Sequence, residues 1–411
     1  MRTGRRSVAE LADEVVREGM CSGCGACPLI EPALSMELDD AGFVRPVRRG
    51  PDSPDQKVRT STFLASCPGR TVAIRRDPAA ESSDPYLGAA VSVWKGHATD
   101  ANMRHAGSSG GVLTALQKWM VDTSAADSVL TTRARPGDPR RSEPHLEQRS
   151  GSITDFAGSR YAPSATLRIL DVTTGDRPVL TAKPCEISAS RGLADSQTIS
   201  EPPLLLSFFC AGVPSQHATS AVLSALGIEP SHPLHALRYR GNGWPGEFTA
   251  TAAPDRASST MSYDESWGRH LGPTVQSRCK LCPDGVGRAA DIVAADFWDA
   301  DDNGYPLFSE QDGVSAVIAR TARGHELLMR ARQAGVVALE PTTLAEIAKI
   351  QPLQVDRVRT LTGRRVGWAL TGRKNVKVRG VGYRRHSVLH PLQTARYAVG
   401  AWRRSRSQLP R

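Results

Sequence analysis

The chain has 411 residues, of which 40% are hydrophobic, and a formal net charge of +10 at pH 7. This length is enough for a large core, and no apolar run approaches the roughly 20 residues that a membrane-spanning helix needs. The first 20 residues carry charges throughout and no apolar segment typical of a signal peptide, so we expect a cytoplasmic protein. There, the eight cysteines are expected to bind metal or take part in catalysis rather than form disulfides.

The positive charge is concentrated near the C-terminus. Residues 355–411 carry 15 Arg and Lys against one acidic residue. Because arginine far outnumbers lysine in the whole chain, the excess indicates compositional bias more than phosphate recognition. We therefore do not expect nucleic-acid binding.

The sequence divides into four zones. Residues 1–76 contain a short helix and the first cysteines, and residues 77–88 have the Pro, Ser and acidic content of a linker. Between residues 89 and 350, apolar runs alternate with amphipathic stretches, which is typical of an α/β domain. Residues 351–411 form a basic tail. The predicted fold is therefore α/β, with a small N-terminal cysteine-rich region packed on a larger domain.

The first cysteine group is the stretch CSGCGAC. Cys21, Cys24 and Cys27 have the C-x2-C-x2-C spacing by which one tight loop offers three thiolates to an iron–sulfur cubane. Where a bacterial ferredoxin loop has its fourth cysteine, this chain has Glu31, whereas Cys67 precedes a proline as that fourth cysteine does. We predict that Cys67 completes the site, and the alternative is Glu31 as an oxygen ligand.

The next motif, AGSSGGVLTAL, begins a predicted amphipathic helix. Ser108, Ser109, Gly110 and Gly111 are small residues that would let an anion approach the free N–H groups at the helix start. Such a terminus suits a phosphate of a nucleotide cofactor. On spacing alone, an ordinary Ser-Gly N-cap without a ligand is the simpler interpretation.

Four further cysteines are expected near one edge of the sheet. A predicted strand at residues 179–182 leads into Cys185, and another at 204–209 leads into Cys210. Cys279 and Cys282 lie in a loop before a predicted strand at 292–295. Open α/β sheets place ligands at the carboxyl ends of their strands, so these cysteines are predicted to converge on one site.

Four thiolates suit zinc as well as a cluster. The three evenly spaced cysteines favour a cluster in the first group, because zinc sites usually take cysteines in pairs. The second group does not separate the two metals.

Other candidates are weaker. Residues 241–246, GNGWPG, match the G-x-G-x-x-G pattern of dinucleotide-binding sites. Trp244, Pro245 and the lack of a strand–turn–helix context argue against such a site. We interpret the segment as a rigid loop carrying an aromatic lid. The remaining polar candidates have no metal-like spacing or resemble a solvated turn, although Asp296 could reach a site; they are His97, His217, His270, Asp296, Asp299, Asp301 and Asp302. No catalytic residue is assigned.

Taken together, these segments resemble the coenzyme F-420 hydrogenase/dehydrogenase beta-subunit family, which also includes 7-hydroxymethyl chlorophyll a reductase. The similar segments follow one another between about residues 20 and 320; they are CSGCGAC, MELDDAGFVRP, HATDANMRHAGSSGGVLTAL, GSRYAPS, KPCEIS, FFCAGVPS, YRGNGWPG, CKLCPD, ADIVAADFW and GVSAVIART.

The resemblance implies a flavin-binding α/β domain with FAD and [4Fe–4S] clusters. One cluster would be held near FAD by Cys185, Cys210, Cys279 and Cys282, and a second by Cys21, Cys24, Cys27 and Cys67. The resemblance also reverses the preference for an ordinary N-cap, because the GSSGG helix start would face the FAD phosphates. Cofactor-binding residues by analogy are Ser108, Ser109, Gly110, Gly111, Thr114, Tyr161, Ser164, Lys183 and Pro184. Lys183 and Glu186 replace the Thr and Gln common in relatives, which adds a charge pair.

The implied activity is that of an oxidoreductase, complete or one subunit of a larger enzyme. It would exchange electrons with a deazaflavin, coenzyme F-420, or take them from a ferredoxin-like donor to reduce an organic substrate. The alternative is a non-catalytic, zinc-stabilised binding protein with a basic docking tail. That tail could be a solvated C-terminus, a docking surface for an acidic redox partner, or a membrane-surface helix at residues 390–406.

Overall fold

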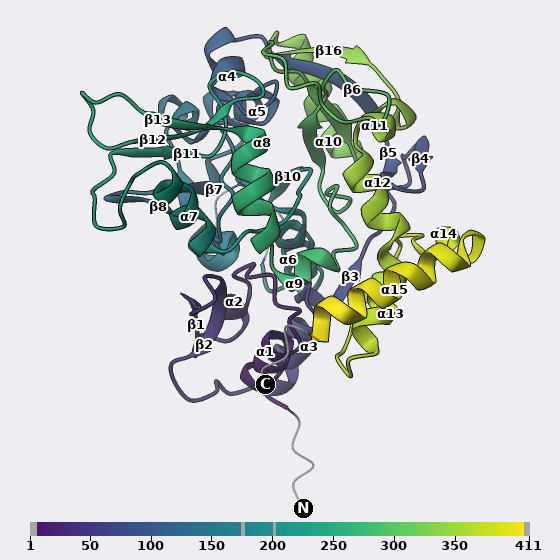
Figure 1. Ribbon diagram of the computed structural model, residues 1–411. Coiled ribbons are helices and arrows are strands. Elements are labelled where there is room, and N and C mark those ends of the chain that lie inside the picture. The colour runs from purple at the N-terminus through teal and green to yellow at the C-terminus, as the bar shows by residue number, and fades with distance from the viewer. Residues whose placement is uncertain (1–5, 174–176, 200–202, 407–411) are drawn as a thin grey trace, which may run out of the picture.

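An eight-stranded mixed sheet forms the centre of the protein (Figure 1). The structure is a computed structural model that describes residues 6–173, 177–199 and 203–406. The strands lie in the order β16 (Val337–Pro341), β6 (Ser92–Ala98), β15 (Ser315–Ala319), β14 (Ile292–Asp296), β10 (Leu204–Phe208), β9 (Pro178–Thr181), β7 (Ser128–Arg135) and β8 (Asp138–Glu147). The predicted α/β fold is confirmed.

Within this sheet β7, β9, β10 and β14 are parallel neighbours, and the pairs outside them are antiparallel. The carboxyl ends of the four parallel strands therefore meet at one edge. The predicted cysteine-bearing connections leave from this edge, because Cys185 follows β9 and Cys210 follows β10.

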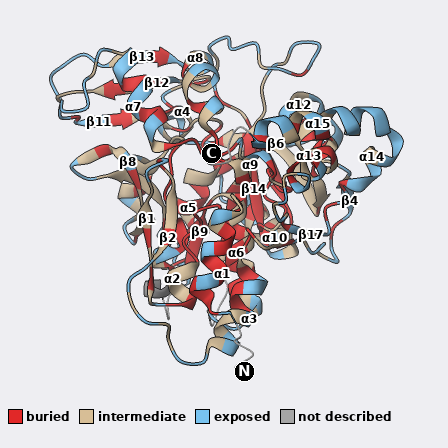
Figure 2. Ribbon diagram, turned by 60° about the horizontal axis from the view of Figure 1, so that its bottom comes forward, coloured by how far each residue is buried: buried red, intermediate tan, exposed pale blue. Residues whose placement is uncertain are grey.

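Alternate residues of the strands enter two different cores. Val179 packs in the core that contains helices α5 (Val112–Asp122) and α10 (Ala322–Gln333), whereas Leu180 packs in the core that contains α6 (Pro184–Asp195). This alternation is what a sheet covered on both faces requires. Figure 2 shows the buried strands between partly exposed helices.

The N-terminal region continues the core on the α6 side. Its elements are α1 (Val8–Arg17), α2 (Cys27–Ile30), β1 (Leu34–Leu38), β2 (Val44–Arg48), α3 (Gln56–Ser66) and β3 (Thr71–Ala73). Helix α1 begins at a capping box in which Ser7 and Glu10 exchange hydrogen bonds, and its apolar face joins the same core as α6. The small N-terminal region thus packs directly on the larger α/β unit.

Smaller elements surround the sheet. The stretch expected to be a linker, residues 77–88, contains β4 and the first residue of β5, which pair as a short antiparallel hairpin. A three-stranded sheet lies to one side in Figure 1. The bounds are β4 (Ser82–Asp84), β5 (Gly88–Ala90), α4 (Ala101–Ala106), α7 (Gln216–Ala225), β11 (Ala236–Arg238), β12 (Glu247–Thr251), β13 (Ser259–Ser262), α8 (Tyr263–Glu265) and α9 (Ser277–Lys280), with 3-10 turns at Ser150–Phe156, Thr166–Thr173 and Gly272–Thr274 and a wider helical turn at Ser266–Leu271.

The C-terminal segment is folded, which corrects its interpretation as a solvated tail. After α11 (Leu344–Ile350), residues 351–406 form α12 (Pro352–Arg359), α13 (Leu361–Ala369), β17 (Lys377–Arg379), α14 (Arg384–Leu389) and α15 (Pro391–Arg406), and residues 407–411 of the predicted tail lie outside the described residues. Strand β17 pairs in parallel with β3 of the N-terminal region. Trp368 is 4% exposed and packs on Gly19, so the two ends of the chain support each other.

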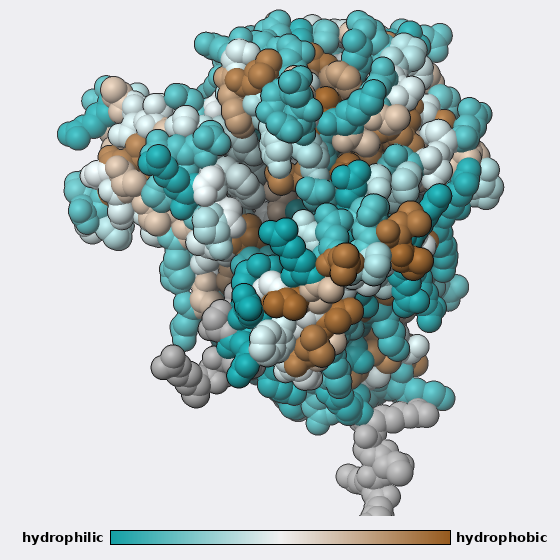
Figure 3. All heavy atoms as spheres, turned by 45° about the vertical axis from the view of Figure 1, so that its right-hand side comes forward, coloured by the Kyte–Doolittle hydropathy of each residue, from teal (hydrophilic) through white to brown (hydrophobic). Residues whose placement is uncertain are grey.

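Exposed apolar side chains occur on the C-terminal helices among many arginines. Figure 3 looks onto this side of the molecule and shows hydrophobic patches separated by hydrophilic groups. The exposed apolar residues of these helices include Val366, Leu370, Val388, Leu389, Leu392 and Val399. A partner-docking surface and a membrane contact both stay predictions for this face. Within the described residues, no helix combines the length and hydrophobicity needed to cross a bilayer.

Candidate functional site

The four cysteines of the N-terminal region line one cavity. Cys21, Cys24, Cys27 and Cys67 face it together, although Cys67 is 40 residues beyond Cys27 in the sequence. The cavity contains about 300 Å³ of empty space, and its other walls are largely apolar, including Ala12, Val15, Met36 and Phe63. Cys67 reaches it because α3 ends there, with Cys67 in extended conformation directly after the helix.

The cysteine loop is held against the larger domain by close backbone contacts. Gly25 has φ +90°, and a β-carbon there would lie 2.7 Å from Ala165 O and from Arg168 N. Next to it, the N–H of Leu167 donates to Cys24 O at 3.1 Å. The loop therefore needs glycine at position 25, both for its positive φ and for this close approach.

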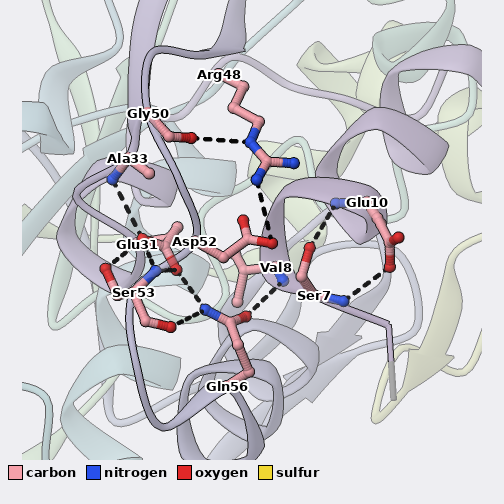
Figure 4. A network of polar contacts seen from close by, with 10 residues as sticks. All are labelled: Ser7, Val8, Glu10, Glu31, Ala33, Arg48, Gly50, Asp52, Ser53 and Gln56. Carbon is pink, nitrogen blue, oxygen red and sulfur yellow. Dashed lines mark hydrogen bonds and ion pairs between the residues drawn. The ribbon is translucent and has the colours of Figure 1, made fainter. Parts of the chain in front are cut away.

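Glu31 belongs to a hydrogen-bond network with Ser53 and Gln56 (Figure 4). Its side chain is fully buried and accepts hydrogen bonds from Ser53 Oγ and Gln56 Nε2, each at 2.6 Å, and from Ala33 N at 3.2 Å. Burial alone would raise the pKa of Glu31, but the hydrogen bonds from Ser53, Gln56 and Ala33 lower it. The carboxylate is thus already satisfied, and it is not among the residues lining the cysteine cavity.

The other four cysteines also come together at the predicted sheet edge. Cys185 begins α6 after β9, Cys210 follows β10, and Cys279 lies in α9 with Cys282 just beyond. Burial is the main cause that raises the pKa of Cys185 well above its usual value, and burial together with the neighbouring Cys279 and Cys282 raises that of Cys210 to about 12. The same causes raise the pKa of Cys24 and Cys67 to about 12 in the first group.

Thiols with such raised pKa values are poor ligands until a metal or cluster replaces their protons. No group of three or more His, Cys, Asp or Glu side chains in the described part of the chain is arranged to hold a metal ion. Zinc would require all four thiolates about 2.3 Å from one ion, whereas in a cubane each thiolate binds a different iron. The two kinds of site therefore place different demands on the spacing of the thiolates.

The GSSGG segment is packed between strands. Ser109 Oγ donates to Val314 O at 2.9 Å, and a β-carbon on Gly110 would lie 2.7 Å from Gly96 O. Helix α5 begins after Gly111, which has positive φ and no side-chain cap. These close contacts require small residues whether or not a ligand binds. The hydroxyl of Ser108 instead contacts a different loop, at Ser159 Oγ.

The GSRYAPS segment connects the two halves of the predicted flavin site. Ser159 at its start meets Ser108, and Ser164 near its end accepts a hydrogen bond from Lys183 Nζ at 2.7 Å. Lys183 also forms a 2.8 Å ion pair with Glu186. The two charges of this pair therefore neutralise each other. Pro184 is buried at the start of α6, and Thr114 faces outward from the first turn of α5 with partial exposure.

An aromatic cluster surrounds a buried ion pair at the end of β14. Arg240 bridges to Asp296 at 2.7 Å and lies over the Tyr263 ring at 4.7 Å. Tyr161 packs edge-on against Trp267, with ring centroids 4.9 Å apart. Burial raises the pKa of Tyr263 well above its usual value, so this phenol stays protonated. Asp296 is therefore part of a structured site rather than a solvated turn.

A larger, open cavity adjoins Ser164. It contains about 790 Å³ of empty space and lies between the β1–β2 hairpin, the β7–β8 hairpin and residues 163–168. Three arginines line it, namely Arg135, Arg141 and Arg168. Arg135 pairs with Glu143 and Arg141 with Asp138, and Glu37 also lines the cavity. Arg168 forms no ion pair among the described residues, and burial and the neighbouring Arg135 lower its pKa. Such a cavity suits an anionic group.

Known proteins match most of this architecture. Residues 93–171 match the N-terminal part of the family described as coenzyme F420 hydrogenase/dehydrogenase, beta subunit, and residues 175–344 match the C-terminal part of the same family. The chain belongs to this beta-subunit family. Membership confirms the resemblance and makes oxidoreductase the broad functional class. The first cysteine group precedes the matched residues, so its assignment depends on the cavity alone.

A solved structure of a related complex contains a chain with the same fold as this protein. It is a chain of the F420-reducing [NiFe] hydrogenase complex from Methanosarcina barkeri, studied by xenon derivatization. The two chains are 19% identical with a TM-score of 0.55, and the match covers 72% of this chain and 98% of that chain. A likeness at this identity supports the α/β fold alone. A search of curated proteins finds no match.

Several polar residues of the site were missed from the sequence. Arg240 lies immediately before the segment interpreted as a rigid loop, and Trp244, expected to form a lid, is buried at 3% exposure. Gln276 and Arg278 contact both cysteine groups. The only sequence signal for a role of these two residues was that they lie within three residues before Cys279. Their residue types alone do not show that the side chains are buried.

Proposed function

We propose that this protein is an iron–sulfur flavoprotein oxidoreductase with two [4Fe–4S] clusters. The observation that carries the proposal is the gathering of all eight cysteines into two groups of four, one of which lines a single cavity. Family membership supports the oxidoreductase class. The two groups are Cys21, Cys24, Cys27 and Cys67, and Cys185, Cys210, Cys279 and Cys282.

The residues present fit clusters. Both sets of donors are cysteine thiols alone, which is the preferred ligand set of a cubane, and the first cavity has apolar walls that would exclude water. A buried arginine, Arg278, also supports this fit. Its guanidinium has no carboxylate partner among the described residues and lies beside Cys282, so bound thiolates would compensate its charge.

We place FAD along the GSRYAPS segment, between Ser108 and Lys183. A bound flavin would accept or donate two electrons at a time and exchange them singly with a cluster. Lys183 is held by Ser164 and Glu186, which would fix its ammonium beside the cofactor. The Tyr161 and Tyr263 rings would exclude water, and the protonated Tyr263 hydroxyl is a candidate proton donor.

The arginine-lined cavity suggests the substrate class. A deazaflavin such as coenzyme F-420, or an organic substrate bearing carboxylate or phosphate, would satisfy Arg135, Arg141 and Arg168. Electrons would come from or go to a ferredoxin-like donor or a partner subunit. The solved relative comes from a multi-subunit hydrogenase complex, which favours a partner subunit.

Anaerobic purification tests this function. The absorption spectrum is measured first, followed by flavin, sulfide and zinc analysis of the same sample. The proposal predicts a brown protein with bound FAD, inorganic sulfide and no stoichiometric zinc. A colourless protein containing zinc and no flavin would instead support the non-catalytic, zinc-stabilised alternative.

A further inference from the structure

The two cysteine groups are joined by residues 276–278. Gln276 Nε2 donates to Ser22 O at 3.2 Å in the first loop, and it lies 3.6 Å from Cys279 Sγ in the second group. Arg278 Nη2 donates to Pro68 O at 2.8 Å, next to Cys67. Both side chains therefore span the interval between the two groups, and both are buried.

Arg278 contacts a sulfur of the second group only. Its guanidinium forms a hydrogen bond with Cys282 and lies near Cys185 and Cys279 of the same group. The side chain is 2% exposed, and among the described residues no carboxylate forms an ion pair with it. A permanently charged guanidinium thus lies against a thiol of the second group, whereas its contact with the first group is to the carbonyl oxygen of Pro68.

The remaining charges strengthen this asymmetry. The second group also has Arg357, which donates to Ala211 O at 2.8 Å beside Cys210, and Lys183, which is balanced by Glu186. The first group has Arg45, but this side chain reaches the carbonyl oxygen of Cys21 rather than a sulfur, and it pairs with Asp39. The second site is therefore the more electropositive of the two.

We propose that Arg278, assisted by Gln276, gives the Cys185–Cys282 site a higher reduction potential than the Cys21–Cys67 site. This inference rests on the proposed function, because it requires a cluster at each site. Reduction adds one negative charge to a cluster, and a nearby positive charge or an N–H donor to sulfur favours the reduced state. One electron then passes from the first site, which is oxidised, to the second, which is reduced, with no bond made or broken.

The direction of the internal relay follows. A donor would deliver electrons at the first site, and the second site, at the sheet edge beside the flavin residues, would receive them. The C-terminal residues are part of this arrangement, because Arg357 lies in α12 and Gln354 of the same helix donates to Cys210 O at 3.3 Å.

Redox titration followed by electron paramagnetic resonance tests the proposal. The full-length protein is compared with Arg278→Gln, Arg278→Lys and the control Arg320→Gln. Arg320 is buried like Arg278, but it donates to Ala89 O and Val286 O and contacts no thiol of either group. Arg278→Gln is expected to lower the reduced-to-oxidised ratio of the second site about 10-fold or more at a fixed ambient potential. Arg278→Lys should keep most of the ratio, and Arg320→Gln all of it.

Each outcome decides one claim. An unchanged ratio in Arg278→Gln with both clusters loaded would overturn the inference, and so would an equal fall in Arg320→Gln. If Arg278→Gln fails to load its clusters, Gln276→Leu provides the test: loss of the N–H near Cys279 Sγ should lower the same ratio by a smaller factor, and no change would overturn the proposal. Wild-type protein that lacks one cluster would instead contradict the proposed function.

Discussion

Substituting Glu31 with glutamine separates its structural role from a role as a cluster ligand. One carboxylate oxygen accepts from Ser53 and Ala33, and the other accepts from Gln56 Nε2 at 2.6 Å. In Glu31→Gln an amide nitrogen replaces one oxygen and faces a donor. Gln56 cannot rotate its amide to accept, because its own oxygen already accepts from Val8 N at 3.1 Å. One charge-assisted bond is lost and one buried donor is left unpaired, which costs roughly 2–4 kcal/mol.

The assay combines chemical denaturation with iron analysis. Glu31→Gln should lower the free energy of unfolding by that amount while the purified protein keeps all of its iron. Glu37→Gln is the matched control, since this partly exposed glutamate pairs with Arg49 at the surface and its substitution should leave the free energy of unfolding nearly unchanged. Loss of about half of the iron from Glu31→Gln at unchanged stability would refute the reasoning and make Glu31 a ligand.

Three further predictions concern the N-terminal region and its C-terminal support. The pKa of Glu14 is lowered from 4.5 to about 2, chiefly by its hydrogen bond with Lys374, so its contribution to stability is present above pH 4.5 and is lost as the pH falls toward 2. Glu14→Gln should flatten this acid branch of a denaturation profile by about 1–2 kcal/mol, and an unaltered profile would contradict the pairing. Trp368→Ala should cost about 3–5 kcal/mol in unfolding experiments, whereas a cost below about 1 kcal/mol would mean that the C-terminal segment is not part of the fold. Gly25→Ala should lower cluster content and melting temperature together, because its β-carbon would meet Ala165 O; a fully loaded, equally stable variant would contradict this packing.

Local patterns in the sequence predicted much of the central sheet. The apolar runs before Cys185 and Cys210 are β9 and β10, and the run at 292–295 lies within β14. These strands are short, buried on both faces and bounded by turn residues, so their signal is independent of distant contacts. The family resemblance, carried by segments in the same order, was confirmed as well.

Features that depend on contacts distant in sequence could not be predicted. The C-terminal segment was interpreted as a tail because of its concentrated positive charge, yet Trp368 is buried against Gly19. Glu31 was the alternative to Cys67 as the fourth ligand because of its position after the three cysteines, and the contacts with Ser53 and Gln56 that hold its carboxylate could not be predicted. For Arg278 the only signal was its place beside Cys279, because the burial of an arginine depends on the neighbours that the fold provides.

Iron quantification in wild-type protein and in two cysteine variants tests the central claim most directly. Cys67→Ala removes one member of the cavity-lining group, and Cys282→Ala removes one member of the group at the sheet edge. Two [4Fe–4S] clusters predict about eight irons per wild-type chain and about four in each variant, with different residual resonance spectra. Wild-type protein with about four irons, unaffected by Cys67→Ala, would contradict the account by showing that the N-terminal cysteines hold no cluster.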